Sequence, residues 1–147
     1  MREILFRGKR IDNGEWVSSG NLITFNDEGE GKQFFIPQMN AKCTCTHDEQ
    51  DNIISFDSGM FYKVDPKTVG QFTGLNDKNG RKIFEGDIVK NGDYTMIVVW
   101  YDFHAAFMLA FSVDGNYFEA ISNSHIYLEV IGNIHDNPEL LGDDVNG

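Results

Sequence analysis

Short apolar segments separated by two-residue turn signals run through most of this 147-residue chain. Four such signals stand between apolar segments: Asn13-Gly14, Asn79-Gly80, Asn91-Gly92 and Asp114-Gly115. Type I′ hairpin turns need positive φ at both central residues, a conformation that Asn, Asp and Gly tolerate best. The pattern therefore predicts a chain built mainly of antiparallel β-hairpins.

The apolar segments have the length and residue types of strands. Residues 95–101 are apolar on both alternating faces, which indicates a strand covered on both sides. Residues 105–113 have the length of a helix, but two aromatic residues and the Asp-Gly pair that follows favour a strand. Further strands are predicted at residues 4–6, 16–17, 88–89, 117–121 and 126–131.

Helical signals are few. Asn137, Pro138 and Glu139 have the order of an N-cap, a first-turn proline and a first-turn acid, so they predict one short helical turn ending at Leu141. Residues 48–56 are a second candidate helix, and residues 26–32 and 38–59 are expected to be long loops.

The expected fold is therefore mainly β, with few short helices. We predict a single domain over residues 1–147, with a subdomain boundary near Asp65-Pro66. Antiparallel hairpins would form two small β subdomains, arranged as a partly closed barrel or as two packed small sheets.

Charge is unevenly distributed along the chain. It has 12 Lys and Arg against 23 Asp and Glu, which gives a net charge of −11. Lys90 is the last basic residue, so nine acids after it give residues 91–147 a charge of −9 and leave −2 on residues 1–90. Such a half repels nucleic acid, and a partner that binds it should have a basic surface.

Composition also bears on the compartment. No run of 18 apolar residues is present, and the first residues lack the apolar core of a signal peptide. The two cysteines, Cys43 and Cys45, are too close in sequence to close more than a small strained loop. We therefore expect a reduced, cytosolic protein that does not enter a membrane.

Two short segments have residue types found at ligand sites. Gly29-Glu30-Gly31-Lys32 resembles part of a phosphate-binding loop, but Asn26 replaces the first glycine and Gln33 the final Ser or Thr, so an exposed acidic loop is favoured. Cys43, Cys45 and His47 would share one face of a strand and could begin a zinc site. Their spacing is not that of a common zinc motif, so small thiols without a metal are favoured.

Signs of catalysis are weak. His135-Asp136 could act as an acid and base pair, but a lone histidine is more often a surface or hydrogen-bonded residue. No nucleophile motif is present. We therefore predict that the protein is not an enzyme, with no catalytic, cofactor-binding or metal-binding residues.

Residues 78–90 contain the densest basic content of the chain. Lys78, Arg81, Lys82 and Lys90 lie there, and Phe72 or Phe84 could serve as a stacking partner for a base. This hairpin is the candidate site of an alternative function, that of a nucleic-acid-binding β-barrel. The net charge favours solvated hairpin flanks instead.

Three ordered motifs give the chain a family resemblance. Residues 69–75, followed by Asp77-Lys78-Asn79-Gly80 and by residues 84–89, carry the first motif; residues 129–141 and 2–8 carry the other two. Together they resemble the YopX family of phage and prophage proteins nearly end to end, with residues 26–60 matching least. The resemblance implies a largely β fold of two small subdomains, a phage or prophage origin, residence in the host cytoplasm and assembly into homo-oligomers. It implies no catalytic residue.

These observations predict a phage or prophage accessory protein that is a non-enzymatic protein–protein interaction or assembly module. A decoy that mimics nucleic acid is a variant of this interpretation. The alternatives are the nucleic-acid-binding barrel that uses residues 78–90, and a small metalloprotein or hydrolase that uses Cys43, Cys45 and His47.

Overall fold

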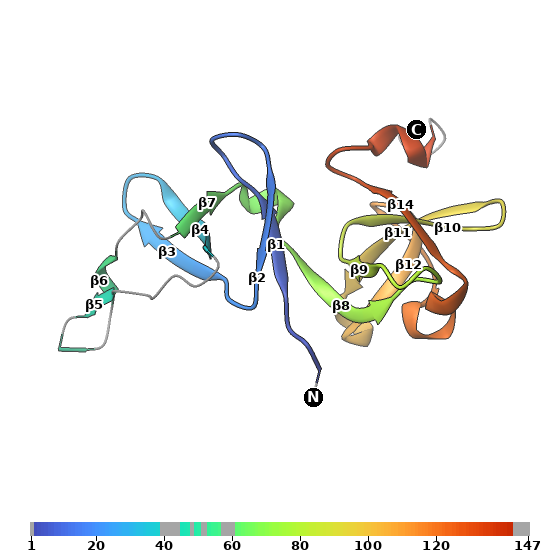
Figure 1. Cartoon of the computed structure of the whole chain (residues 1–147), viewed down its shortest axis with the longest axis horizontal. Helices are drawn as coiled ribbons and strands as arrows, with labels where there is room; N and C mark the ends of the chain where they lie inside the picture. Colours follow the sequence, from blue (N-terminus) through green and yellow to red (C-terminus); the bar gives the residue numbers. More distant parts are fainter. Residues whose placement is uncertain (1, 39–44, 48, 51–52, 57–60, 143–147) are drawn as a thin grey trace. The chain divides into compact units, whose positions relative to one another are not determined.

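The structure, a computed structural model, describes residues 2–38, 45–47, 49–50, 53–56 and 61–142 (Figure 1). Two compact units make up these residues: an N-terminal unit, Glu3–Val69, and a C-terminal unit from Gly70 onward that also contains Arg2. Within the described residues, antiparallel strands dominate both units, and the helices are single 3-10 turns. The mainly β prediction is confirmed. None of the described sheets closes into a barrel, so the partly closed barrel is not observed.

The N-terminal unit consists of small antiparallel sheets. Strands β1 and β2 form a hairpin, β3-β4-β7 form a sheet in that order, and β5 and β6 pair. Its strands are β1 (Phe6–Lys9), β2 (Trp16–Ser19), β3 (Ile23–Asp27), β4 (Gly31–Pro37), β5 (Cys45–His47), β6 (Ile53–Phe56) and β7 (Phe61–Val64). Phe35, Ile36, Phe61 and Val64 are buried, and a 3-10 turn η2 (Pro66–Thr68) ends the unit.

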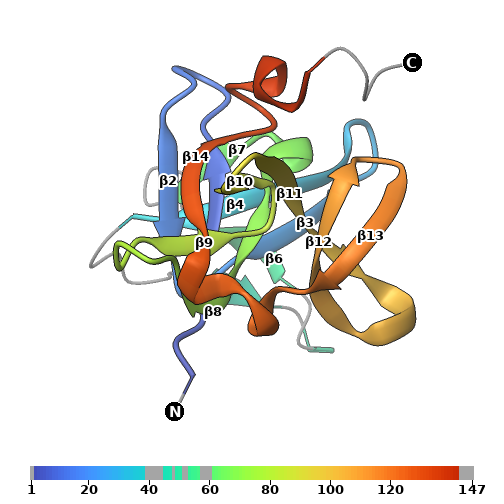
Figure 2. The ribbon, with the colours of Figure 1, turned by 90° about the vertical axis from the view of Figure 1, so that its right-hand side faces the viewer.

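The C-terminal unit contains a hairpin and a larger sheet. Strands β8 and β9 form the hairpin, and the sheet has five strands in the order β13-β12-β11-β10-β14. The strands are β8 (Gly70–Asn76), β9 (Lys82–Phe84), β10 (Asp87–Asn91), β11 (Tyr94–Tyr101), β12 (Ala106–Ser112), β13 (Gly115–Ala120) and β14 (Glu129–Asn133). The 3-10 turns are η3 (Asp102–His104), η4 (Ile121–Asn123), η5 (His125–Tyr127) and η6 (Pro138–Leu141). Figure 2 shows β12 and β13 side by side.

The five-stranded sheet carries the core of the C-terminal unit. Alternate residues of β11 point to opposite faces, so Met96 and Val98 face the apolar cluster that also contains Leu109 of β12. Ile97 points the other way and is also buried, and η6 packs against the same strand. The prediction that β11 is covered on both sides is therefore correct for its centre.

Buried polar contacts tie distant motifs of the C-terminal unit together. The backbone amide of Ile134 donates to the carbonyl of Gly86 at 3.0 Å, and the amide of Lys78 donates to the carbonyl of Leu128 at 2.9 Å. Gly70 has no room for a side chain, because a Cβ there would lie 2.7 Å from the carbonyl oxygen of Glu85. These contacts join β8 and β9 to the last strand.

Several local predictions need correction. Only the glycine of Asn13-Gly14, Asn79-Gly80 and Asn91-Gly92 has positive φ, so these turns are not type I′. The loop expected at residues 26–32 is only a short turn, because β3 extends to Asp27 and β4 starts at Gly31. The loop expected at residues 38–59 contains β5 and β6, and Ile53–Phe56 is a strand where a helix was considered. Strand β14 starts at Glu129, because residues 125–127 form η5. Asn137 makes no capping bond to η6; its side chain instead accepts a hydrogen bond from the amide of Asn133.

Candidate interaction surface

The loop between β11 and β12 is a tight, internally bonded turn. The indole Nε1–H of Trp100 donates to Oδ1 of Asp102 at 2.7 Å, and the amide of Ala105 donates to the carbonyl of Asp102 at 3.1 Å. Ala105 has a φ of 47°, a left-handed conformation that is uncommon outside glycine. The single turn η3 is thereby fixed between two strands, at the end of the β12–β13 hairpin opposite its Asp114-Gly115 turn.

Aromatic rings gather around this turn. Phe103 at its centre is 82% exposed. Tyr101 stacks on Tyr117 of β13 with ring centroids 4.1 Å apart and planes inclined by 23°. His104 lies 5.1 Å from Tyr101 and 5.3 Å from Phe103, centroid to centroid. We call Tyr101, Phe103, His104 and Tyr117 the aromatic tip.

The opposite face of the same strand end is also aromatic. Trp100 alternates with Tyr101 along β11 and therefore points to the other face, where it meets Phe107 of β12 edge-on at 5.0 Å. Trp100 is 44% exposed, and with Phe107, Gln71 and Glu85 it lines an open hollow of about 260 Å³. Large exposed rings this close together are typical of protein-binding surfaces.

Among the described residues, no cation lies over the rings of the aromatic tip, in contrast to rings elsewhere in the chain. Within the described residues, Arg7 lies over Trp16, Arg10 over Tyr62 and Lys82 over Phe72. No such contact reaches the described tip residues, and strands β11 to β14 contain neither Lys nor Arg. The tip is therefore an aromatic surface on an acidic sheet.

Sequence analysis did not identify the aromatic tip. The available signal was the run Trp100-Tyr101-Asp102-Phe103-His104, in which four of five side chains carry rings. Tyr117 was not predictable from this run, because it stacks on Tyr101 only after β12 has been placed between their two strands.

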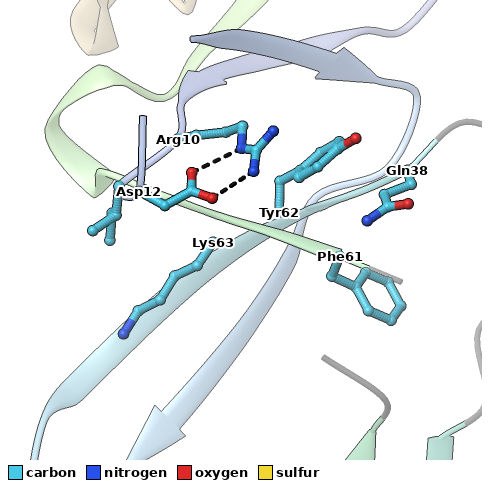
Figure 3. A pocket seen from close by; sticks show the side chains of 7 residues that line it. Arg10, Asp12, Gln38, Phe61, Tyr62 and Lys63 are labelled. Carbon is cyan, nitrogen blue, oxygen red and sulfur yellow. Dashed lines mark hydrogen bonds and ion pairs between the residues drawn. The ribbon is translucent and has the colours of Figure 1, made fainter. Parts of the chain in front are cut away.

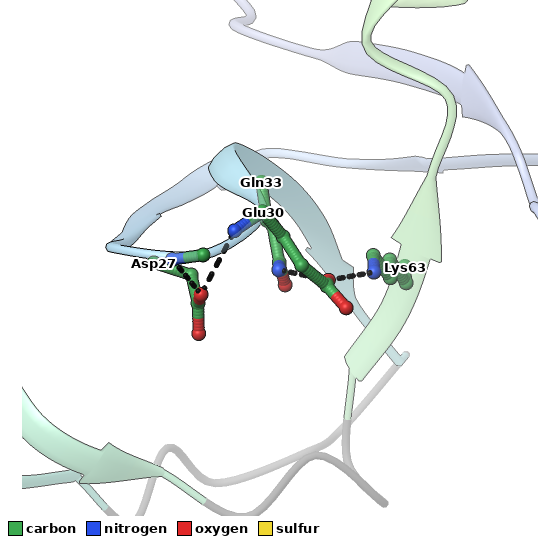
Figure 4. A network of polar contacts seen from close by, with 5 residues as sticks. Asp27, Glu30, Gln33 and Lys63 are labelled. Atoms are coloured by element: carbon green, nitrogen blue, oxygen red, sulfur yellow. Dashed lines mark hydrogen bonds and ion pairs between the residues drawn. The ribbon is translucent and has the colours of Figure 1, made fainter.

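The acidic loop at residues 29–32 is a tight turn whose amides are already bonded. Oδ1 of Asp27 accepts from the amides of Gly29 and Glu30 at 2.7 and 3.0 Å (Figure 4). These bonds lower the pKa of Asp27, so the amides that a phosphate would need hold a carboxylate instead. Glu30 in turn accepts from Gln33 and pairs with Lys63 at 3.5 Å. The geometry favours the acidic turn over a phosphate site.

One of the three candidate metal ligands falls outside the described residues. Cys43 is not among them, while Cys45 and His47 belong to β5. Pairing of β5 with β6 shifts register between Thr46 and His47. The hypothesis of a site at Cys43, Cys45 and His47 therefore remains a prediction for experiment.

In the basic hairpin, two of the four basic side chains and both rings are engaged in structural contacts. Phe72 is only 4% exposed and packs against Phe84, with centroids 5.6 Å apart, so it cannot stack on a base. Lys78 pairs with Glu129 at 3.6 Å, and Lys82 lies 5.3 Å from the centre of the Phe72 ring. These contacts favour solvated hairpin flanks over a nucleic-acid site.

His135 and Asp136 belong to a bonded turn. The side-chain Oδ1 of Asn133 accepts from both of their amides, at 3.0 and 2.9 Å, and its Nδ2 donates to Oδ2 of Asp136 at 3.2 Å. These three hydrogen bonds fix the backbone turn before η6, which is a structural role for this segment.

A second hollow lies in the N-terminal unit. Its volume is about 350 Å³ (Figure 3). It is lined by Arg10, Ile11, Asp12, Gln38, Phe61, Tyr62 and Lys63. The Arg10 guanidinium lies 4.3 Å from the Tyr62 ring centre and forms a two-bond ion pair with Asp12, its Nε donating to Oδ1 at 2.8 Å. Hydrogen bonding between the two raises the pKa of Arg10 and lowers that of Asp12. The positive charge of Arg10 is therefore balanced by the carboxylate of Asp12 in the same chain.

The family profile described as "YopX protein" matches residues 5–142, nearly the whole chain. The chain belongs to the YopX family. The resemblance expected from the sequence is therefore confirmed. Three of the motif residues, Asp77, Gly86 and Asn133, form hydrogen bonds that hold β8, β9 and the C-terminal turn together, so these three have a structural role.

Other comparisons add little about activity. A crystal structure of protein EF1440 from Enterococcus faecalis is similar, with 24% sequence identity, a TM-score of 0.49 and coverage of 94% of this chain and 97% of that one. No curated protein matches the chain. Within the described residues, no helix has the length and apolar character needed to span a membrane.

Proposed function

We propose that this YopX protein is a non-enzymatic protein–protein interaction module that binds a partner with a basic surface. The observation that supports the proposal is the combination of exposed aromatic rings and uncompensated negative charge on the C-terminal sheet. Three exposed rings, those of Trp100, Phe103 and Tyr117, lie on β11, η3 and β13, where no Lys or Arg balances the acids. Exposed aromatic residues supply contact area, and uniform negative charge attracts a positive partner.

The proposal includes a setting. Family membership supports a phage or prophage accessory protein that acts in the bacterial cytoplasm. The chain would there meet host or phage proteins with basic surfaces, of which nucleic-acid-handling proteins are the most basic. A decoy for nucleic acid would be one form of such binding.

Charge reversal tests the proposal. The immobilised protein is incubated with nuclease-treated host lysate, and retained proteins are identified at low salt and at about 300 mM salt, where surface charges are largely screened. Asp93→Lys with Asp114→Lys reverses two exposed charges on the C-terminal sheet; Glu15→Lys with Glu28→Lys makes the same change in the N-terminal unit. We expect the first pair, and not the second, to abolish retention of a basic protein. Equal retention by both pairs would reject the proposal.

Self-association is the second part of the proposal. Strand β13 is an edge strand of the five-stranded sheet, and an edge presents backbone groups that another chain can pair with. Together with the family resemblance, this supports a homo-oligomer. Light scattering should give a mass that is a multiple of 16.7 kDa; a single-chain mass at every concentration would reject assembly.

A further inference from the structure

We infer that the aromatic tip receives an arginine side chain of a partner protein. This inference rests on the proposed function and identifies the chemical group that the acidic sheet recognises. It is carried by three features of the tip: the exposure of its rings, the lack of a cation over them, and the carboxylate within the same turn.

The rings are positioned before any partner binds. The Trp100–Asp102 hydrogen bond and the left-handed Ala105 fix η3, and the stack of Tyr101 on Tyr117 fixes the adjoining surface. Phe103 is 82% exposed at the centre of this bonded turn, with its ring centroid 5.3 Å from that of His104. An exposed ring on an already ordered backbone loses less conformational entropy on binding than one on an unstructured segment, which suits it to act as an anchor residue at an interface.

The ligand should be a cation because the chain itself places cations over several of its rings. Arg7, Arg10 and Lys32 lie over Trp16, Tyr62 and Phe34 within the N-terminal unit. No described Lys or Arg lies over the tip, and residues 91–147 cannot supply a cation of this kind because they contain no Lys or Arg. A cation from another molecule would complete the same type of contact.

Arginine fits better than lysine. In this chain, the guanidinium carbons of Arg7 and Arg10 lie 4.7 and 4.3 Å from ring centres, whereas the ammonium groups of Lys9, Lys32 and Lys82 lie 5.9, 5.4 and 5.3 Å away. A planar guanidinium stacks on a ring and can also donate to a carboxylate. Asp102 lies beside Phe103 in the turn, and among the described residues only Trp100 bonds to its carboxylate, through Oδ1.

The probe is a short synthetic peptide in which arginine alternates with glycine, compared with the same peptide containing lysine. Fluorescence anisotropy gives the affinities, and NMR of the aromatic protons locates the contact. We expect the arginine peptide to bind several-fold tighter than the lysine peptide and to shift the Tyr101, Phe103 and Tyr117 signals. Phe103→Ala should weaken binding of the arginine peptide about five-fold or more.

Two further variants keep the test specific. Phe103→Leu retains an apolar side chain but removes the ring face, so it should weaken binding as Phe103→Ala does. Tyr94→Ala removes another exposed ring, 64% exposed, at the other end of β11, and should leave the affinity within about two-fold. Circular dichroism confirms that each variant is folded.

Equal affinity for the two peptides would overturn the inference, and so would an equal loss of peptide affinity in Phe103→Ala and Tyr94→Ala. Two further outcomes would also overturn it: self-association that Phe103→Ala abolishes, and binding of an oligonucleotide at the tip. The last two would assign the tip to a second copy or to nucleic acid. If charge reversal abolishes capture of a basic protein while the arginine peptide gives no tip signal, only this inference fails. If charge reversal does not change the capture of basic proteins, the proposed function is rejected, whatever the peptide experiment shows.

Discussion

Asp77 and Val130 are joined by a buried hydrogen bond, in which the backbone amide of Val130 donates to Oδ2 of Asp77 at 3.0 Å across 53 residues of sequence. The other carboxylate oxygen, Oδ1, accepts from the amides of Asn79 and Arg81 at 2.8 and 2.9 Å. One side chain that is 6% exposed therefore shapes the turn of the β8–β9 hairpin and attaches it to β14.

Asp77→Asn should destabilise the protein. Asparagine keeps one acceptor oxygen for Asn79 and Arg81, but its amide nitrogen would face the N–H of Val130, which is also a donor. A buried donor left without an acceptor costs about 1–3 kcal/mol in the free energy of unfolding. Urea denaturation measures the loss, and Asp114→Asn in an exposed turn serves as the control, expected within about 0.5 kcal/mol of wild type. A loss no larger than that of the control would contradict the role given to Asp77.

The same carboxylate predicts how stability depends on pH. Burial alone would raise the pKa of Asp77, but hydrogen bonds from the amides of Val130, Arg81 and Asn79 outweigh it and hold the pKa below its ordinary value of 3.8. Because the unfolded chain takes up the proton first, the charged form stabilises the fold fully above that ordinary value, and the contribution is lost as pH falls through the folded-state pKa.

The measurement is the difference in unfolding free energy between wild type and Asp77→Asn. It should be constant from pH 7 to about pH 5 and should shrink as the pH falls below about 4. Taking the difference removes the similar contributions of Asp12 and Asp27, whose pKa values are also lowered. A difference that grows on acidification would have the wrong sign for this explanation.

Much of the hairpin organisation could be predicted from sequence, because glycine marks places where the backbone must adopt positive φ. Gly14, Gly80 and Gly92 do so, with φ of 72°, 81° and 58°. The predicted type I′ turn was wrong, because the asparagine before each of these glycines has negative φ. Local signals identify that a turn exists, whereas the register of the paired strands decides which residues occupy it.

The aromatic tip shows what a single sequence could not give. Tyr101 and Tyr117 meet only because the sheet places β12 between their strands, and pairing of β12 with β13 shifts register between Leu109 and Ala110. Neither the strand order nor this irregularity leaves a periodic signal. The scaffold residues were recognisable by family motif, while the exposed residues that we propose as functional were not.

Gly70→Ala should destabilise the C-terminal unit. The added Cβ would lie 2.7 Å from the carbonyl oxygen of Glu85, a backbone atom that cannot move without shifting β9. Overpacking of this kind costs about 1–3 kcal/mol, which thermal or urea denaturation would detect. Gly20→Ala is the control, because its nearest atom is 3.4 Å away, an ordinary contact. Equal stability of the two variants would show that β8 and β9 can separate without cost.

Zinc content tests the hypothesis of a metal site at Cys43, Cys45 and His47. We expect protein purified without added zinc to contain well under one equivalent by elemental analysis, because the cysteines lack the spacing of a common zinc motif. Cys45→Ala is the matched variant. Stoichiometric zinc in wild type that is lost in Cys45→Ala would support the metalloprotein alternative.

The last prediction concerns nucleic acid, the alternative function of residues 78–90. Phe72 is buried against Phe84, Lys82 covers Phe72 and Lys78 pairs with Glu129, so Phe72 cannot stack on a base and two of the four basic side chains of the hairpin are already engaged. The acids after Lys90 add repulsion. We therefore expect no shift of a labelled DNA or RNA oligonucleotide by micromolar protein at about 50 mM salt, where nonspecific attraction is strong. A shift that Arg81→Glu with Lys82→Glu abolishes, and that Phe103→Ala leaves unchanged, would make this hairpin the functional site in place of the aromatic tip.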